Sequence, residues 1–256
     1  MIIRWQSFVN SEVNKPYIDR LHDYLNSIAA PGNQVEIVEM YPPARDFGRL
    51  QEFRCAQTVV KNAIQAERDG CGAFVIGHFQ ESGLYEARAS CTIPITGMGE
   101  ATLLWASHVG RRIGLISLDD AFEVIHLEQM ERYSLLSRLA GIKGINFAVA
   151  DFAAAFDGEE SAYQRIVAKF SEAARELIAL GADVLVPAGG LFGLLTADKV
   201  GFAVDGAPVI PCTPITLGWA EMSLKLHTNQ GLAPSRGPSF ALSTDRAIQD
   251  FLTEGP

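Results

Sequence analysis

The sequence predicts an α/β protein made of two pseudo-symmetric lobes, each a parallel sheet flanked by helices, with an active-site cleft between them. Two observations predict this class. Short apolar runs alternate with longer helical patterns along the chain, which is typical of βα units around parallel sheets. Segments of the first half of the chain are also repeated in the second half. A duplicated α/β unit favours two similar lobes that face one another.

The apolar runs and the helical patterns give the order of the elements. Strands are predicted at 2–8, 35–40, 73–77, 93–97, 113–117, 143–149, 183–187 and 207–211. Helices are predicted at 15–28, 50–68, 83–90, 100–109, 121–138, 159–180, 193–200 and 214–228. Hydroxyl N-cap candidates open residues 243–252 and predict a short C-terminal helix, whereas the Gly- and Pro-rich residues 229–241 are expected to be irregular.

Three pairs of segments carry the internal repeat. GCGAFVIGHFQESGL (70–84) aligns with GADVLVPAGGLFGLL (181–195), IPITGMGEATLLWA (93–106) with APVIPCTPITLGWA (207–220), and IRWQS (3–7) with IGLIS (113–117). All βα units look somewhat alike, but three matches in one order, at offsets of 110 to 114 residues, favour a true duplication. We therefore expect a first flavodoxin-like lobe at 1–106, joined by the C-terminal helices of 214–256, and a second at 107–213.

Composition excludes several classes of function. The net charge of −9 and a pI near 5.1 argue against a nucleic-acid partner, which needs clustered Lys and Arg. No apolar run reaches the roughly 18 residues of a membrane span, and the N-terminal residues do not read as a signal peptide. The four cysteines have no metal-ligand spacing and are interpreted as reduced thiols of a cytoplasmic protein.

The repeat pairs residues at the ends of equivalent strands. It matches Ser7 with Ser117, and His78 with Gly189. Ligands of open α/β sheets bind beyond the carboxyl ends of the parallel strands. If the lobes face each other, these positions converge on one cleft.

Two segments resemble a known superfamily. FVIGHFQESGLYEARASCTIPITGMGEA (74–101) resembles the first-half motif of the aspartate/glutamate/hydantoin racemase superfamily, and GADVLVPAGGLFGLL and DGAPVIPCTPITLGWAEM resemble its second-half motifs. The resemblance covers about residues 1–228 and is closest to the hydantoin racemase branch in GMGEA (97–101). It implies two lobes around a small carboxylate or cyclic amide, one cysteine per lobe for proton transfer, no metal or organic cofactor, and a homo-oligomer.

The sequence departs from this pattern at both cysteines. The first falls on His78 and the second on Gly189, so a two-thiol racemisation cannot run. Decarboxylases of the superfamily keep one cysteine, whereas this chain keeps neither. An imidazole titrates near neutral pH and could take the place of the first thiol, although a buried histidine can also be purely structural.

The neighbours of His78 are further candidates. Glu81 could orient the imidazole or act as a second acid–base group, or it could simply open a helix near the favourable end of the dipole. Phe79 and Gln80 are expected to contact the substrate. Gly189 and Gly190 let the backbone approach a ligand closely, which suits a carboxylate or a developing oxyanion.

The remaining candidates have structural alternatives. Cys212 follows a strand end and could be a relocated nucleophile or proton donor, or a small buried thiol. The resemblance gives Gln6, Ser7, Asn10 and Ser117 the task of holding a substrate carboxylate, and each serine could instead be a helix N-cap.

Three functions remain open at this point. The first is a cofactor-independent isomerase or racemase of a small carboxylate or hydantoin-like cyclic amide, with His78 as base. The second is a lyase or hydrolase on the same scaffold, which needs only one acid–base group. The third is a non-catalytic binding protein for a small ligand.

Overall fold

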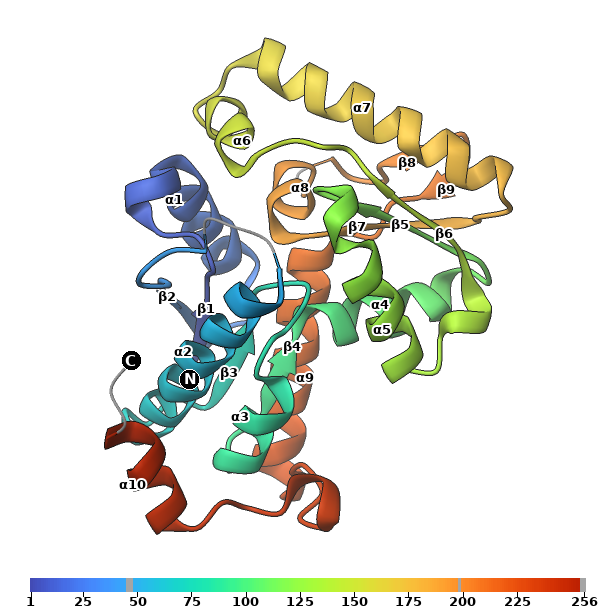
Figure 1. Cartoon of the computed structure of the whole chain (residues 1–256). Coiled ribbons are helices and arrows are strands. Elements are labelled where there is room, and N and C mark those ends of the chain that lie inside the picture. The colour runs from blue at the N-terminus through green and yellow to red at the C-terminus, as the bar shows by residue number, and fades with distance from the viewer. Residues whose placement is uncertain (45–47, 198, 254–256) are drawn as a thin grey trace.

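The computed structural model describes residues 1–44, 48–197 and 199–253, and two parallel sheets organise it (Figure 1). The first sheet has the strand order β2-β1-β3-β4, with β1 at Ile2–Gln6, β2 at Gln34–Val38, β3 at Ala73–Ile76 and β4 at Ile95–Gly97. The second has the order β6-β5-β7, with β5 at Ile113–Ser117, β6 at Leu139–Gly144 and β7 at Val184–Ala188.

Helices connect and cover the strands. In the first half they are α1 (Ser11–Ile28), α2 (Arg49–Arg68), α3 (Leu84–Ser90) and α4 (Met98–Val109). In the second half they are α5 (Glu123–Arg132), α6 (Val149–Phe156), α7 (Glu160–Ala179) and α8 (Gly190–Leu195). The chain ends with the long α9 (Cys212–Gln230) and the short α10 (Asp245–Thr253). Within the described residues, no helix is long and apolar enough to cross a membrane.

The two sheets repeat one arrangement, which confirms the predicted fold class. In both, the first strand of the lobe lies between the second and the third, and every pairing is parallel. Trp5 is in register with Val75 in the first sheet, and Leu115 with Val186 in the second. Where the first sheet has β4, the described part of the second sheet has a parallel bridge between Leu185 and Val209. This bridge lies beside the two-stranded ribbon of β8 (Ala203–Val204) and β9 (Ala207–Pro208).

Burial explains why the central strands could be predicted from sequence. Every residue of β3, β5 and β7 is buried, so these strands are continuous apolar runs, as expected when helices cover both faces of a parallel sheet. The helix α9 packs against β3 and β4 of the first sheet and also against α8 of the second half (Figure 1). The predicted boundary at residues 106 and 107 lies inside α4 and stays a proposal.

Several predicted boundaries are wrong in the second half. The strand expected at 143–149 is β6, which ends at Gly144, and residues 149–156 form α6 instead. The segment VADFAAAF is rich in alanine, a strong helix former, and the Asp151 carboxylate accepts a hydrogen bond from the Ala148 N–H at the helix start (2.6 Å). The helix expected at 121–138 is shorter, because α5 ends at Arg132 and a 3₁₀ turn follows it.

Candidate functional site

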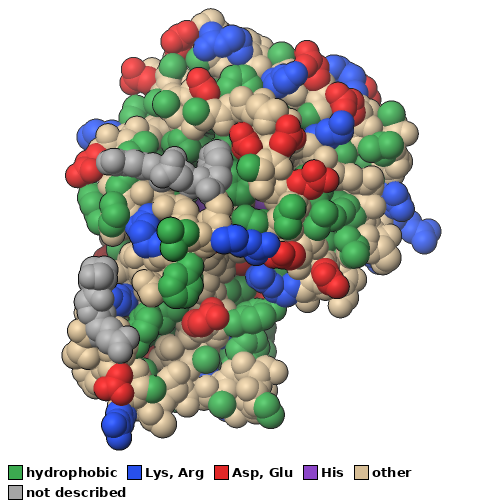
Figure 2. Space-filling model, viewed as in Figure 1, with side chains coloured by type: hydrophobic (Ala, Val, Ile, Leu, Met, Phe, Trp, Pro, Cys, Tyr) green, Lys and Arg blue, Asp and Glu red, His purple; other side chains and the backbone are tan. Residues whose placement is uncertain are grey.

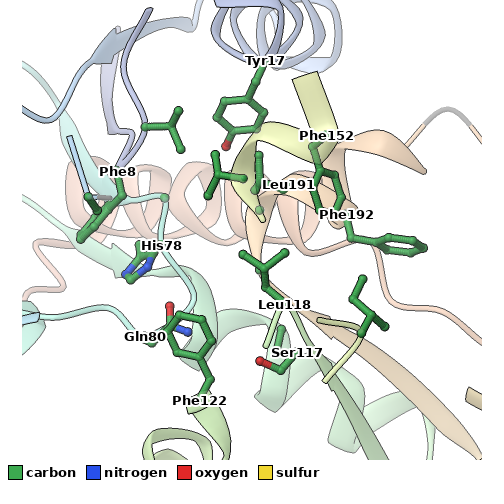
Figure 3. A pocket seen from close by; sticks show the side chains of 18 of the residues that line it. Phe8, Tyr17, His78, Gln80, Ser117, Leu118, Phe122, Phe152, Leu191 and Phe192 are labelled. Atoms are coloured by element: carbon green, nitrogen blue, oxygen red, sulfur yellow. The ribbon is translucent and has the colours of Figure 1, made fainter. Parts of the chain in front are cut away.

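A cavity of about 100 Å³ lies where the carboxyl ends of β3, β5 and β7 meet. Its walls come from both lobes: Phe8, Tyr17 and His78 from the first, and Ser117, Leu118 and Phe192 from the second (Figure 3). The prediction that the strand ends of the two lobes converge on one cleft is therefore confirmed for His78, Ser117 and Gly189, which all line this cavity.

His78 stands one residue beyond Gly77, at the end of β3, and its ring faces the cavity (Figure 3). The ring stacks on Phe8 with a centroid separation of 3.9 Å and an interplanar angle of 13°. Its Nδ1 atom is buried, has no hydrogen-bond partner among the described residues, and lies 3.9 Å from Oε2 of Glu52. Burial lowers the pKa of His78 below its usual value, while the Glu52 carboxylate opposes this shift. The neutral imidazole is thus the form present at neutral pH.

The diglycine turn of the second lobe faces the His78 turn. Gly189 has an extended backbone (φ 169°, ψ 145°), and a Cβ added there would meet no atom within 4 Å. A Cβ added at Gly190 would lie 3.2 Å from the Tyr17 hydroxyl and 3.7 Å from the Gly77 carbonyl oxygen. The diglycine turn therefore leaves open space in the cavity, with the Tyr17 hydroxyl beside it.

Most of the cavity wall is apolar. Phe122, Phe152, Phe192, Leu118 and Leu191 surround the space beyond His78 (Figure 3), and Phe192 is held by stacking on Phe170 at 3.9 Å between centroids. Among the described lining residues, Glu52 is the only one with a carboxylate, and none is a lysine or an arginine. Gln80, at 7% exposure, contributes the one side-chain amide.

Charged side chains meet outside the cavity, at the junction between the upper and lower parts of the molecule (Figure 2). Outside the cavity, Arg49 of α2 donates to Glu128 of α5 across the two lobes (Nη1 to Oε2, 2.8 Å). Both residues line a second, more polar cavity, which shares Glu52 and Gln80 with the first. Glu52 thus stands between the two cavities.

Of the eleven residues proposed from sequence, the structure brings five into the cavity: His78, Gln80, Ser117, Gly189 and Gly190. The other six are buried outside it: Gln6, Ser7, Asn10, Phe79, Glu81 and Cys212.

Three polar residues, the last of β1 and two in the segment that follows it, form hydrogen bonds with the backbone around them. Gln6 donates to the carbonyl oxygens of Ser7 (2.7 Å) and Val38 (3.2 Å), and Asn10 accepts from the Val13 N–H at the start of α1 (3.2 Å). The Ser7 hydroxyl donates to the Val9 carbonyl oxygen (2.7 Å). The polar groups of these three residues therefore form hydrogen bonds within the chain, and the residues do not line the cavity.

Glu81 sits in a buried network that joins the two lobes. Its Oε1 accepts from the Tyr133 hydroxyl and from Gln129 Nε2 (3.0 Å), and its Oε2 accepts from the Glu100 N–H (2.8 Å). Burial raises the pKa of Glu81, and these three donors oppose the rise. Phe79 lies in the same region, where its carbonyl oxygen accepts from Gln129 Nε2 (2.6 Å).

This network explains the glycines of the GMGEA segment. A Cβ at Gly97 would lie 2.3 Å from Glu81 Oε2, and one at Gly99 would lie 2.1 Å from Gln129 Nε2. Only glycine leaves room for Glu81 and Gln129 here. The geometry therefore makes Glu81 a link between α4, α5 and the His78 turn.

Cys212 contacts the diglycine turn but lies outside the cavity. Its thiol donates to the Gly189 carbonyl oxygen at 3.5 Å and does not line the cavity. Burial raises the pKa of Cys212 to about 12, so the thiol stays protonated at neutral pH although it opens α9. A reactive thiolate is not favoured at this position.

Two cavity residues with ionisable side chains, Glu52 and Tyr17, were not predicted from the sequence. Glu52 lies on α2, 26 positions before His78, and only the packing of α2 on the sheet brings the two together. Tyr17 lies in α1, where Asn14 interrupts the helix (φ −153°, ψ 75°) and accepts from the Tyr17 N–H (3.1 Å). Asn14 and Pro16 mark a helix start by sequence, which fixes where Tyr17 falls in the first turn but not which way it points.

Within the described residues, no group of three or more His, Cys, Asp or Glu side chains could hold a metal ion. The polar groups of the cavity are instead an imidazole, a carboxylate, an amide and two hydroxyls. Such a set suits proton transfer and hydrogen bonding to a small polar ring.

Comparisons with known proteins place the chain in the Asp/Glu/hydantoin racemase family. The family model of Asp/Glu/hydantoin racemases matches residues 8–218. A hydantoin racemase from Pseudomonas sp. (strain NS671) is 24% identical over 127 residues, which span 48% of this chain and about half (51%) of that protein.

Two solved structures show the same fold over nearly the whole chain. An allantoin racemase from Klebsiella pneumoniae has a TM-score of 0.74 at 20% identity and covers 95% of this chain and 94% of its own. The allantoin racemase AllR from Pseudomonas fluorescens has a TM-score of 0.73 at 17% identity, with 95% and 97% covered.

Proposed function

Because the chain belongs to the Asp/Glu/hydantoin racemase family, we propose that it is an isomerase that racemises a small cyclic amide, with His78 as the base in place of a thiol. The observation that carries this proposal is the cavity that His78 shares with Gly189, between the strand ends of the two lobes. The family relationship supports isomerase chemistry, and the residues of the cavity support the choice of substrate class. A homo-oligomeric state remains part of the proposal.

The charges of the cavity favour a neutral substrate over a dicarboxylate. A dicarboxylate would bring two negative charges next to Glu52, into a wall with no lysine or arginine among the described lining residues. Burying charges without partners is costly. A ring amide is uncharged, and the Gln80 amide can both donate to it and accept from it. The aromatic and aliphatic wall suits an apolar substituent on the ring.

The chemistry begins at His78. Its neutral imidazole takes the proton from the ring carbon next to a carbonyl, the C–H bond breaks, and the electron pair moves onto the carbonyl oxygen to form an enolate. The lowered pKa of His78 keeps the imidazole unprotonated for this step. The backbone of Gly189 and Gly190 can approach the enolate oxygen closely, since no side chain stands there.

Racemisation requires that a proton return to the opposite face of the ring. We assign this to the Tyr17 hydroxyl, which lies on the Gly190 side of the cavity. Burial raises the pKa of Tyr17, so the hydroxyl keeps its proton until the enolate forms. The phenolate then recovers a proton from the imidazolium through solvent, which returns both groups to their starting forms.

The alternative function is a lyase. An enolate that forms by loss of CO₂ needs no second base. The absence of a side chain at Gly189, on the second side of the cavity, is consistent with this reaction. The C–C bond to the carboxylate would break, CO₂ would leave, the electron pair would enter the enolate, and one proton from water, passed on by His78, would end on the enolate carbon. This path requires an acid substrate, which the charges of the cavity disfavour.

One experiment separates racemisation from hydrolysis and from binding without reaction. L-5-isobutylhydantoin is incubated with the protein in D₂O, and three quantities are followed: deuterium at the ring carbon by proton NMR, the enantiomer ratio by chiral chromatography, and ring opening by mass spectrometry. We expect deuterium incorporation together with racemisation. Ring opening without exchange would support a hydrolase, and a ligand-induced rise in Tm without any reaction would support a binding protein.

Variants connect the reaction to the cavity. His78→Ala is expected to abolish both exchange and racemisation, whereas Tyr17→Phe should allow exchange but slow racemisation at least tenfold, because one face loses its proton donor. His22→Ala, an exposed position of α1, is the matched control. Unchanged exchange in His78→Ala would overturn the proposed function.

A further inference from the structure

We propose that Glu52 is a positioning residue, which holds the proton of His78 on Nδ1 so that Nε2 is the basic atom presented to the substrate. The catalytic consequence of this arrangement rests on the proposed function, whereas the arrangement itself can be tested without any substrate.

The first observation is that the Nδ1 atom of His78 lacks a partner. It is buried, and no hydrogen bond reaches it from the described residues. A buried nitrogen without a partner costs free energy in either protonation state. Oε2 of Glu52 is 3.9 Å away, too far for a direct hydrogen bond but within reach of one bridging water or of a small side-chain movement.

The second observation is that Glu52 is itself held in place. The Ser82 hydroxyl donates to the same Oε2 atom, and Ser82 lies in the turn that follows His78. The Glu52 side chain is only 15% exposed, and it reaches the cavity from α2. The turn that carries the imidazole thus also fixes the carboxylate that faces it.

The third observation concerns the ring. Stacking on Phe8 fixes the plane of the imidazole, so the position of its proton is the main variable left. A carboxylate beside Nδ1 attracts the proton to that nitrogen, which leaves a lone pair on Nε2. Among the described residues, His126 of α5 is a further titratable group near His78, and burial lowers the pKa of His126 to about 4, so it adds no charge at neutral pH.

The proposal predicts one tautomer of the His78 ring, the form with its proton on Nδ1. In the wild type at pH 7.5, long-range ¹H–¹⁵N NMR of the imidazole rings should show His78 protonated on Nδ1, with His78→Gln used to assign its signals among the five histidines. In Glu52→Gln the loss of the negative charge should lower the pKa of His78 by half a unit or more and shift the ring towards the Nε2–H form. Ser82→Ala should act in the same direction with a smaller effect.

Glu128→Gln is the matched control, because Glu128 lies on the wall of the second cavity but does not line the first. It should leave the pKa and the tautomer of His78 unchanged. An Nε2–H tautomer in the wild type, or a Glu52→Gln protein with the same tautomer and pKa as the wild type, would overturn the proposal.

Kinetics separate this inference from the proposed function. With L-5-isobutylhydantoin in D₂O, Glu52→Gln should lower kcat for exchange by ten- to a hundredfold with little change in KM, and should move the acid limb of the rate profile to lower pH by the shift that NMR measures. If His78→Ala abolishes exchange but Glu52→Gln leaves that limb in place, the role of Glu52 is wrong and the proposed function stands. If His78→Ala leaves exchange intact, the proposed function fails, and the NMR result still decides the tautomer.

Discussion

A Cβ built on Gly190 would lie 3.7 Å from the carbonyl oxygen of Gly77, so the turn after β7 in one lobe faces the turn after β3 in the other. The residues that follow and precede these glycines, His78 and Gly189, are those where relatives are expected to carry a thiol. In this chain the first position holds an imidazole, and the second holds a glycine with open space beside it. The first prediction concerns that space.

Gly189→Cys should restore a proton-transfer group on the side of the cavity opposite His78. The backbone there is extended, a conformation that any residue adopts, and the new Cβ would meet no atom within 4 Å. We expect a Tm within about 2 °C of the wild type, which corresponds to a change of about 0.5–1 kcal/mol at most. Racemisation of L-5-isobutylhydantoin, followed by chiral chromatography, should rise at least tenfold, because a well-placed acid–base group contributes about 10²–10⁴-fold.

Gly193→Cys is the control for that variant. It adds the same side chain four residues later, but its Cβ would lie 2.1 Å from the Cys212 sulfur. Overpacking of this kind costs about 1–3 kcal/mol, so this variant should unfold at lower urea concentration. Equal stabilities of the two cysteine variants, or no gain in racemisation for Gly189→Cys, would contradict the geometry described for the cavity.

The second prediction tests the junction around Glu81. Gly99→Ala should lower the free energy of unfolding by about 3 kcal/mol, because its Cβ would lie 2.1 Å from Gln129 Nε2 and 2.3 Å from the Phe79 carbonyl oxygen. Gly218→Ala, in the middle of α9, meets open space and should gain about 0.5–1 kcal/mol from helix propensity. Urea unfolding measures both, and a Gly99→Ala protein as stable as the wild type would show that this network contributes little.

The sequence predicts the fold best where burial imposes a pattern. The strands β3, β5 and β7 are fully buried and appear as apolar runs, so their ends, and with them His78 and Gly189, could be placed in advance. The prediction failed at β6, an edge strand whose six residues are all half-buried and include two glycines and a lysine. A strand exposed in this way has no distinctive periodicity.

The site was predictable only in part, for a related reason. Residues at strand ends could be brought together from topology, but the partner of His78 comes from a helix surface, and nothing in the local sequence around Glu52 distinguishes it from a solvated residue of α2. Glu81 and Cys212 carry reactive groups and lie near the cleft, yet their side chains turn into hydrogen-bonded or packed surroundings. Side-chain direction in a turn, such as the left-handed Glu81 (φ 48°), is set by tertiary packing.

The third prediction concerns stability at acid pH. Burial lowers the pKa of His126 to about 4 in the folded protein, against an ordinary value near 6.5 in the unfolded chain. Neutral His126 therefore favours the fold above pH 6.5, and this contribution disappears as the pH falls towards 4, because the unfolded chain takes up the proton first. The loss amounts to about 3 kcal/mol.

Urea unfolding at pH 7 and pH 4 should reveal this loss of stability when the wild type is compared with a variant that lacks His126. His126→Gln should lose about 3 kcal/mol less than the wild type between the two pH values, since it has no group to protonate. His22→Gln, at an exposed position of α1, should follow the wild type. If His126→Gln and the wild type showed parallel losses, His126 would not be a neutral, desolvated group in the fold.

The fourth prediction is the pH dependence of the reaction itself. A base must be unprotonated to act, so kcat/KM for deuterium exchange should fall below the pKa of His78 in the unliganded protein. Burial in the cavity lowers that pKa, so the acid limb should lie below pH 6.5, and the rate should be level from there to the onset of any basic limb. Phe8→Leu removes the stacked ring but keeps an apolar wall, and the loosened imidazole should gain water and move the limb upward, towards 6.5. A wild-type limb above pH 7 would mean that another group acts as the base.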